Sequence, residues 1–320
     1  MIKTYREAVI EAAAEEMRRD ASVIVMGEDV GIYGGGQGAT EGLIEEFGPE
    51  RVIDTPVSET AFVGAAAGAA ATGMRPIVEL MFSDFMAVCW DQIMNEAAKL
   101  HFMYGLSVPM VIRMAAGGGT GASAQHSQSL ENMYTQVPGL KVVVPSTPYD
   151  AKGLLKSAVR DNNPVIFLEQ KLLYKTEGEV PDEEYTVPIG KAAVRREGSE
   201  AVLISYGRMV QVCLEAAKEL EQDGISTEVL DLRTLSPLDE EAVLSAVRKT
   251  GRAVIVHEAV QFGGFGGELA AFIAEHAFDA LKAPIKRVGG AYCPIPSAPA
   301  SESNAFPDKA GIIAAVKALL

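Results

Sequence analysis

Glu59 is a carboxylate whose position in the sequence could support acid–base chemistry. It lies at the start of a run of small residues, 58–73, that predicts a helix packed closely against another backbone, either inside the domain or at a subunit interface. The helix dipole favours a negative charge in the first turn, and this alone would account for a glutamate there. A glycine-rich loop (residues 34–38) precedes Glu59, and two aromatic residues, Phe82 and Phe85, follow it. Together these features could form a site for a flat, partly apolar ligand.

His126 is the second residue that could take part in chemistry. It is a lone histidine between Gln125 and Ser127, and a polar loop residue without a chemical role is the structural alternative. The chain has 4 histidines and 3 cysteines, widely spaced. They show neither zinc-ligand spacing nor a CxxC pair, so we predict no zinc site and no disulfide framework.

The glycines of the sequence invite a nucleotide-binding hypothesis, which the surrounding residues disfavour. Gly119-x-Gly121-x-x-Ala124 follows a predicted strand and loosely fits the dinucleotide fingerprint. That fingerprint requires an acidic residue about 20 positions further on, at the end of the next strand. Here the next strand is followed by Pro145 and Ser146, and no GxxxxGK[ST] motif occurs.

Short β-branched runs alternate with longer helical stretches along the chain, which predicts an α/β fold with a mostly parallel sheet. A Thr4-x-x-Glu7 capping box opens the first helix. We expect helices over residues 5–19, 58–73, 84–104, 148–160, 210–222, 239–249 and 308–319, and strands over 23–26, 75–80, 108–114, 140–144, 165–169, 201–205, 227–232, 253–257 and 285–288.

Residues 177–190 interrupt this alternation with clustered acids and two prolines, and we interpret them as an exposed acidic linker. The expected domains are therefore 1–176 and 191–320. The longest small-apolar run, 61–71, is far shorter than the ~20 residues of a membrane span. With no visible secretory signal and no cysteine pairing, we expect a cytoplasmic protein.

Composition excludes further function classes. The chain is 48% hydrophobic and 22% charged, too apolar for a disordered protein. Its 28 basic and 43 acidic residues give a net charge of −15, which disfavours nucleic acid as a partner. The acidity is compatible with a basic protein partner, although it also serves solubility.

Several separate motifs resemble one family over nearly the whole chain. They are Asp54-Thr-Pro-Val-Ser-Glu59, Ala124-Gln-His-Ser-Gln128, Pro138-Gly-Leu-Lys-Val-Val143, Asp150-Ala-Lys-Gly-Leu154 and Asp161-Asn-Asn-Pro-Val165. They are similar to the β subunit of the thiamine-diphosphate-dependent decarboxylating component of 2-oxo acid dehydrogenase complexes. The resemblance implies a pyrimidine-binding parallel-sheet domain followed by a transketolase C-terminal-like α/β domain.

The resemblance also implies roles for individual residues. Glu59 would hydrogen-bond the aminopyrimidine ring and exchange a proton with it, which generates the reactive carbanion. His126 would face the substrate channel and bind the 2-oxo acid or assist transfer to a lipoyl arm. The remaining cofactor-binding residues implied are Glu28, Val57, Met81 and Phe85. For Phe85 and Glu28, a core aromatic and a solvated acid remain the structural alternatives.

Cofactors and partners follow from the same resemblance. Thiamine diphosphate would be shared with an α subunit in an α2β2 assembly. This chain contains no GDG triplet, so Mg²⁺ would be held by α. A lipoyl acyltransferase would dock near Glu302, Asp308 and the carboxylate of Leu320. A potassium ion would bind Asp161 and Asn163 with carbonyls of Met110, Ala158 and Val159; a plain helix C-terminal turn before Pro164 is the alternative.

The substrate that we expect first is pyruvate. Residues 79–82 and 169–174 also look like acetoin dehydrogenase β subunits, and branched-chain 2-oxo acids come third. A non-catalytic assembly subunit is the rival from another class, which the presence of Glu59 and His126 disfavours. Substrate walls are shared with α, so this sequence alone does not decide among the three.

Overall fold

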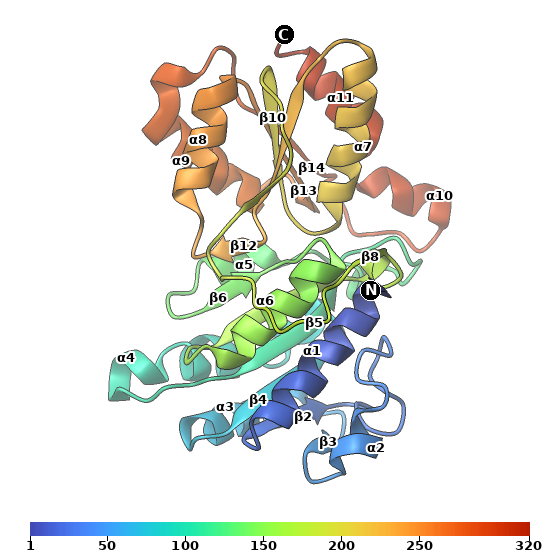
Figure 1. Cartoon of the computed structure of the whole chain (residues 1–320), viewed down its shortest axis with the longest axis vertical. Coiled ribbons are helices and arrows are strands. Elements are labelled where there is room, and N and C mark those ends of the chain that lie inside the picture. The colour runs from blue at the N-terminus through green and yellow to red at the C-terminus, as the bar shows by residue number, and fades with distance from the viewer. The chain divides into compact units, whose positions relative to one another are not determined.

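Each of the two units of the chain is built around a mainly parallel sheet. Figure 1 shows the computed structural model, which describes residues Met1–Leu320. One unit comprises Met1–Ala116 and Met133–Ile189, and the other comprises Gly117–Asn132 and Gly190–Leu320. Segment 117–132 thus belongs to the second unit, although we expected residues 1–176 to form one continuous domain.

Parallel strands in the order β6-β7-β5-β4-β2-β3 form the sheet of the first unit. Their residues are almost all buried, as expected for strands covered on both faces. The strands are β2 (Val23–Gly27), β3 (Val52–Asp54), β4 (Arg75–Leu80), β5 (Val111–Ala116), β6 (Lys141–Val143) and β7 (Val165–Gln170).

Two long helices of the first unit, α1 and α6, pack side by side (Figure 1). In α1 the predicted capping box is present: the Glu7 N–H donates to Thr4 Oγ1, and the Thr4 N–H donates to Glu7 Oε2. The helix α3 packs against β2 and β4. The helices of this unit are α1 (Tyr5–Arg19), α2 (Leu43–Phe47), α3 (Glu59–Ala71), α4 (Leu100–Tyr104), α6 (Pro148–Arg160) and the short 3₁₀ helix η4 (Lys171–Leu173).

The prediction of one long helix over residues 84–104 is wrong. The chain forms a 3₁₀ helix η1 (Ser83–Ala87), a π-helical segment η2 (Gln92–Ala97) and then α4. At the break the Thr60 hydroxyl donates to the Val88 carbonyl at 2.6 Å, which ties this segment to the first turn of α3. The hydroxyl of Thr60, on α3, thus hydrogen-bonds the Val88 carbonyl just after η1 ends.

The predicted acidic linker is only partly exposed. Strand β8 (Glu177–Glu179) pairs antiparallel with β1 (Ile2–Thr4), and Val180 and Val187 are buried in the first unit. The Lys156 ammonium also binds Glu184. Arg160 binds the same carboxylate, at 2.6 Å. Residues 177–189 therefore pack as part of the first unit, because strand pairing, two buried valines and ion pairs anchor them.

The second unit contains a five-stranded sheet in the order β14-β13-β10-β11-β9, parallel except at β9. Helices α7 and α11 cover one face and α8 and α9 cover the other (Figure 1). The elements are β9 (Ala193–Arg196), β10 (Ala201–Ser205), α7 (Arg208–Gln222), β11 (Thr227–Asp231), β12 (Thr234–Ser236), α8 (Glu240–Thr250), β13 (Ala253–Val260), α9 (Phe265–Ala277), η5 (Phe278–Ala280), β14 (Lys286–Gly290), α10 (Pro299–Glu302), η6 (Ser303–Ala305) and α11 (Lys309–Lys317). Along the sequence, segment 117–132 contains η3 (Ala124–His126) and the first residues of α5 (Glu131–Thr135), which continues into the first unit at Met133. No helix of the chain has the length and apolar content needed to cross a bilayer.

His257 is a buried imidazole in β13. Its Nδ1 hydrogen-bonds the Ala259 carbonyl at 2.9 Å, and its ring stacks on that of Tyr206. Burial, which disfavours the charged form, lowers the pKa of His257 to about 4. The folded chain therefore holds this ring neutral at pH values where an unfolded histidine is protonated.

This difference predicts a loss of stability in mild acid. An unfolded histidine titrates near 6.5, so the contribution of neutral His257 is complete above that pH and is lost as the pH falls toward 4. The loss should amount to about 3 kcal/mol across this window. We expect the difference in unfolding free energy between wild type and His257→Gln, measured by urea titration at several pH values, to shrink by that amount. A difference that does not change with pH would contradict the assignment.

Candidate functional site

Polar residues of the first unit follow the carboxyl ends of neighbouring parallel strands. The pairing register sets Gly27, the last residue of β2, beside Asp54 on β3 and Glu79 on β4. Glu28 comes directly after Gly27 and therefore lies just beyond the carboxyl end of β2. The carboxyl ends of strands in open α/β sheets are where such folds bind ligands.

Glu28 and Glu59 are two carboxylates that lie close together near the start of α3. Each is 8% exposed. Burial raises the pKa of Glu28, and the nearby negative charge of Glu59 raises it further, while a hydrogen bond from the Ser58 backbone opposes the shift. Glu28 Oε1 has no hydrogen-bond partner. The sequence predicted both residues for one site, and the structure places them near each other.

Cys89 is a third group at this place, which the sequence did not single out. Burial raises the pKa of its thiol to about 12, and the charge of Glu59 adds to the shift. The thiol is therefore protonated at neutral pH and behaves as a small apolar wall beside the carboxylate. A lone cysteine inside an apolar stretch gave no signal in the sequence.

Phe82 and Phe85, the aromatic pair suggested as a wall of the site, lie against each other. Their rings meet edge to face with centroids 5.6 Å apart, and the Lys171 ammonium lies 5.2 Å from the Phe82 centroid. Two further predicted cofactor-binding residues differ in their exposure: Val57 is 82% exposed, and Met81 is half-buried. A Cβ on Gly36 would lie 2.5 Å from Met81 Cγ, so the glycine-rich loop contacts this side chain closely.

A buried ion network fixes that loop to the sheet. Arg113 donates to both carboxylate oxygens of Glu169, at 2.6 and 3.0 Å, and lies 3.4 Å from Glu79 Oε2. The other oxygen of Glu79 accepts from the Gly36 N–H at 2.9 Å. Burial raises the pKa of Glu79, and the Arg113 guanidinium opposes that shift. The sequence carries a signal for this network, because all three charged residues interrupt apolar strands.

Removing the cation of this network should be costly. We expect Arg113→Met to lower the unfolding free energy of the first unit by about 3–5 kcal/mol, because it leaves two buried carboxylates without a cation. The matched control is Arg18→Met, which breaks the Arg18–Glu46 pair on the surface, where the two side chains are 55% and 40% exposed. That control should cost less than about 1 kcal/mol. Equal effects of the two substitutions in urea unfolding would show that Arg113 has no special role.

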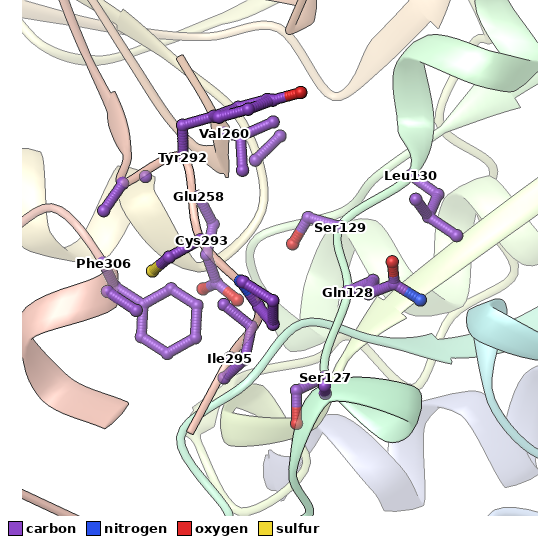
Figure 2. A pocket seen from close by; sticks show the side chains of 16 residues that line it. Ser127, Gln128, Ser129, Leu130, Glu258, Val260, Tyr292, Cys293, Ile295 and Phe306 are labelled. Carbon is purple, nitrogen blue, oxygen red and sulfur yellow. The ribbon is translucent and has the colours of Figure 1, made fainter. Parts of the chain in front are cut away.

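His126 belongs to the second unit, in the 3₁₀ turn η3 of segment 117–132. Beside it lies a cavity of about 390 Å³. Figure 2 shows Ser127, Gln128 and Ser129 on one side of this cavity and Tyr292, Cys293 and Phe306 on the other, with Glu258 between them. The Ser127 hydroxyl is buried and has no hydrogen-bond partner, which makes it a free polar group beside the cavity.

Glu302 does not lie on an exposed docking surface, contrary to the expectation from sequence. It is 4% exposed, and both of its carboxylate oxygens accept backbone N–H groups, from Gly119 at 2.8 Å and Gly121 at 2.9 Å. Asp308 and Leu320 are exposed. Sequence reasoning missed this role because an acid among small polar residues looks like a surface group.

The predicted potassium loop is tied down by two basic side chains. The Val159 carbonyl accepts from Arg75 Nη1 at 2.8 Å, and the Lys141 ammonium binds the Asp161 carboxylate. The other Asp161 oxygen accepts from the backbone and the side chain of Asn163. Among the carbonyls, Ala158 accepts the Asp161 N–H and Met110 accepts the Val165 N–H. These contacts already bring positive charge to the loop and do not favour an added cation, so potassium binding stays a prediction.

Comparison with known families extends over both units. Residues 2–177 match the family described as "Transketolase, pyrimidine binding domain", and residues 190–312 match "Transketolase, C-terminal domain". A solved structure titled "Split gene transketolase, inactive beta4 tetramer" has a similar fold, with a TM-score of 0.82 and 24% identity over 99% of this chain and 97% of that one.

Several other proteins are more similar to this chain in sequence than that solved structure is. The acetoin:2,6-dichlorophenolindophenol oxidoreductase subunit beta of Cupriavidus necator is 50% identical over 97% of this chain and 95% of its own. The 2-oxoisovalerate dehydrogenase subunit beta of Bacillus subtilis is 49% identical over 96% of both. The pyruvate dehydrogenase E1 component subunit beta of Rickettsia felis is 46% identical over 98% of this chain and 97% of its own. With both domains matched in order, the chain belongs to the transketolase-like family of β subunits of thiamine-diphosphate-dependent 2-oxo acid and acetoin dehydrogenases.

Proposed function

We propose that this chain supplies the pyrimidine half of a thiamine diphosphate site in a 2-oxo acid dehydrogenase that is active only with its α subunit. The observation that carries the proposal is the pair of buried carboxylates, Glu28 and Glu59, at the start of α3. The Mg²⁺ and the diphosphate would be held by α, since this chain has no GDG motif. An α2β2 assembly is part of the proposal.

The residues present suit an aminopyrimidine ring. Such a ring is flat and carries nitrogens that exchange hydrogen bonds with a carboxyl group. Phe85 offers an aromatic face, and the unpartnered Glu28 Oε1 offers a free acceptor. Val57 and Met81 complete the proposed wall. When bound, thiamine diphosphate supplies the carbon nucleophile and the electron sink that decarboxylation requires.

In this proposal Glu59 holds and returns one proton at its carboxyl oxygen. Glu59 is the first residue of α3. Glu28, whose pKa is raised by burial and by Glu59, retains a proton more readily than an isolated glutamate. His126 binds the carboxylate or carbonyl of the substrate and assists transfer to the lipoyl arm.

The lipoyl acyltransferase partner remains part of the proposal in a revised form. Asp308 caps α11 through the Gly311 N–H and is exposed, and Leu320 is exposed as well. We propose the surface around Asp308 and Leu320 for a basic docking domain, and Glu302 is no longer included. Attraction between charged surfaces steers such association and weakens with salt.

Pyruvate is the substrate that we propose first. Acetoin is the second candidate, because the acetoin-oxidising relative of Cupriavidus necator shares 50% identity with this chain. We expect the αβ pair, reconstituted with thiamine diphosphate and Mg²⁺, to reduce an artificial electron acceptor fastest with pyruvate. Acetoin and a branched-chain 2-oxo acid are the comparison substrates, and each subunit alone should be inactive. Turnover by the isolated chain would refute the shared site, and a preference for another substrate would reassign the specificity.

The role of Glu59 has its own test. Glu59→Gln keeps the volume of the side chain but cannot exchange a proton, so turnover of the αβ pair should fall ~10²–10⁴-fold. Glu240→Gln is the matched control, because Glu240 is also the first residue of a helix, α8, and is exposed. It should leave turnover unchanged. Unaltered deuterium exchange at the cofactor's reactive carbon in Glu59→Gln would show that the acid acts elsewhere.

A further inference from the structure

Two buried carboxylates accept the backbone N–H groups of the glycine-rich segment that leads to His126. Glu302 accepts from Gly119 and Gly121 at 2.8 and 2.9 Å. Glu258 accepts from the Gly118 N–H at 2.8 Å and lies 3.3 Å from Arg208 Nη1. Three N–H groups within four residues thus converge on two carboxylates that are 4% and 3% exposed.

The glycines are required for this convergence. Gly119 and Gly121 have φ values of +90° and +71°, a region that side chains disfavour. A Cβ on Gly118 would lie 2.2 Å from the Phe306 ring, so no side chain fits there. Successive N–H groups in such alternating conformations form a concave site for an anion. Here the anion is supplied by the chain itself.

The same segment is fixed on the far side of His126. The Gly117 N–H donates to the Gln128 carbonyl at 3.1 Å, which closes the loop on itself. The Asn132 side chain donates to the Gly263 carbonyl at 2.8 Å. Between these anchors Ser123 adopts φ +66°, and the turn η3 follows immediately. Hydrogen bonds on both sides of His126 therefore fix the backbone of the loop that carries it.

We propose that Glu302 and Glu258 are positioning residues for His126, which hold its loop in the geometry needed for substrate. The inference rests on the role of His126 in the proposed function. A carboxylate is required at 302 because two N–H groups share it. A glutamine there offers one acceptor oxygen and sets an NH₂ group against the second donor. The charged acceptor also makes the stronger hydrogen bonds.

The test compares Glu302→Gln in two backgrounds of the reconstituted αβ pair. In the wild-type background kcat for the preferred 2-oxo acid should fall about 10- to 100-fold, since small displacements of a catalytic group have effects of this size. In the His126→Ala background the same substitution should change kcat less than about twofold, because its effect passes through His126. Equal losses in both backgrounds would overturn the proposal.

Asp239→Asn is the matched control for the loss of a buried carboxylate. Asp239 lies in the same unit, is 8% exposed, and accepts the N–H groups of Ala192 at 3.0 Å and Ala242 at 3.4 Å. Its replacement should leave kcat unchanged. Glu258→Gln is the second variant of the proposal and should repeat the dependence on His126.

Hydrogen exchange of the αβ pair provides a readout that does not depend on activity. The amides of residues 117–126 should exchange about tenfold faster in Glu302→Gln than in wild type, while Asp239→Asn leaves them unchanged. Unchanged exchange in Glu302→Gln would overturn the proposal even if turnover fell. If the wild-type pair turned over none of the substrates, the proposed function would fail, and exchange would still decide whether Glu302 holds the loop.

Discussion

Backbone N–H groups in glycine-rich loops must find acceptors, and buried carboxylates provide them in both units of this chain. In the first unit, the buried Glu79 accepts from Gly36, and Asp54, which is itself exposed, accepts from Gly31 at 2.6 Å. In the second, Glu258 and Glu302 accept from Gly118 to Gly121. Glycine brings no side chain that could fix a loop and loses the most conformational freedom on folding. These hydrogen bonds therefore determine the shape of segments that would otherwise be loosely defined.

Burying a carboxylate is unfavourable unless an opposite charge and hydrogen bonds compensate. The buried carboxylates of this chain differ in how far they are compensated. Glu79 and Glu169 share the Arg113 guanidinium, and Glu258 lies beside that of Arg208. Glu28 instead has an unpartnered oxygen and the charge of Glu59 nearby, which raises its pKa. The carboxylates of the network accept hydrogen bonds within the chain, whereas Glu28 Oε1 has no such partner. The contrast separates the candidate site from the supporting network.

Local signals predicted the regular elements well. The Thr4–Glu7 box predicted the start of α1, and Thr147 followed by Pro148 marks that of α6, where the Thr147 hydroxyl accepts the Asp150 N–H. The pairing of Glu79 with Arg113 depends on the register of two neighbouring strands, so the sequence showed the charges but not their partners. The break after η1 involves the Thr60 hydroxyl, a contact between elements, and periodicity alone could not predict it. Glu28, Glu59 and Phe85 were assigned to the site through the family resemblance; the sequence pattern itself showed only that Glu28 follows a strand and that Glu59 begins a helix, and their roles stay predictions.

The hydrogen bond from Gly119 to Glu302 joins residues 183 positions apart in the sequence. During protein synthesis it can form only after the chain has been extended to residue 302. A ribosome that adds about 5–20 residues per second delivers Glu302 roughly 10–40 s after Gly119. During that interval the strands and helices up to residue 189 can assemble, while the loop of His126 waits for its acceptors. The nascent chain can thus acquire most of its first unit well before the histidine loop reaches its final shape. The loop therefore reaches its final shape only after residue 302 has been synthesised.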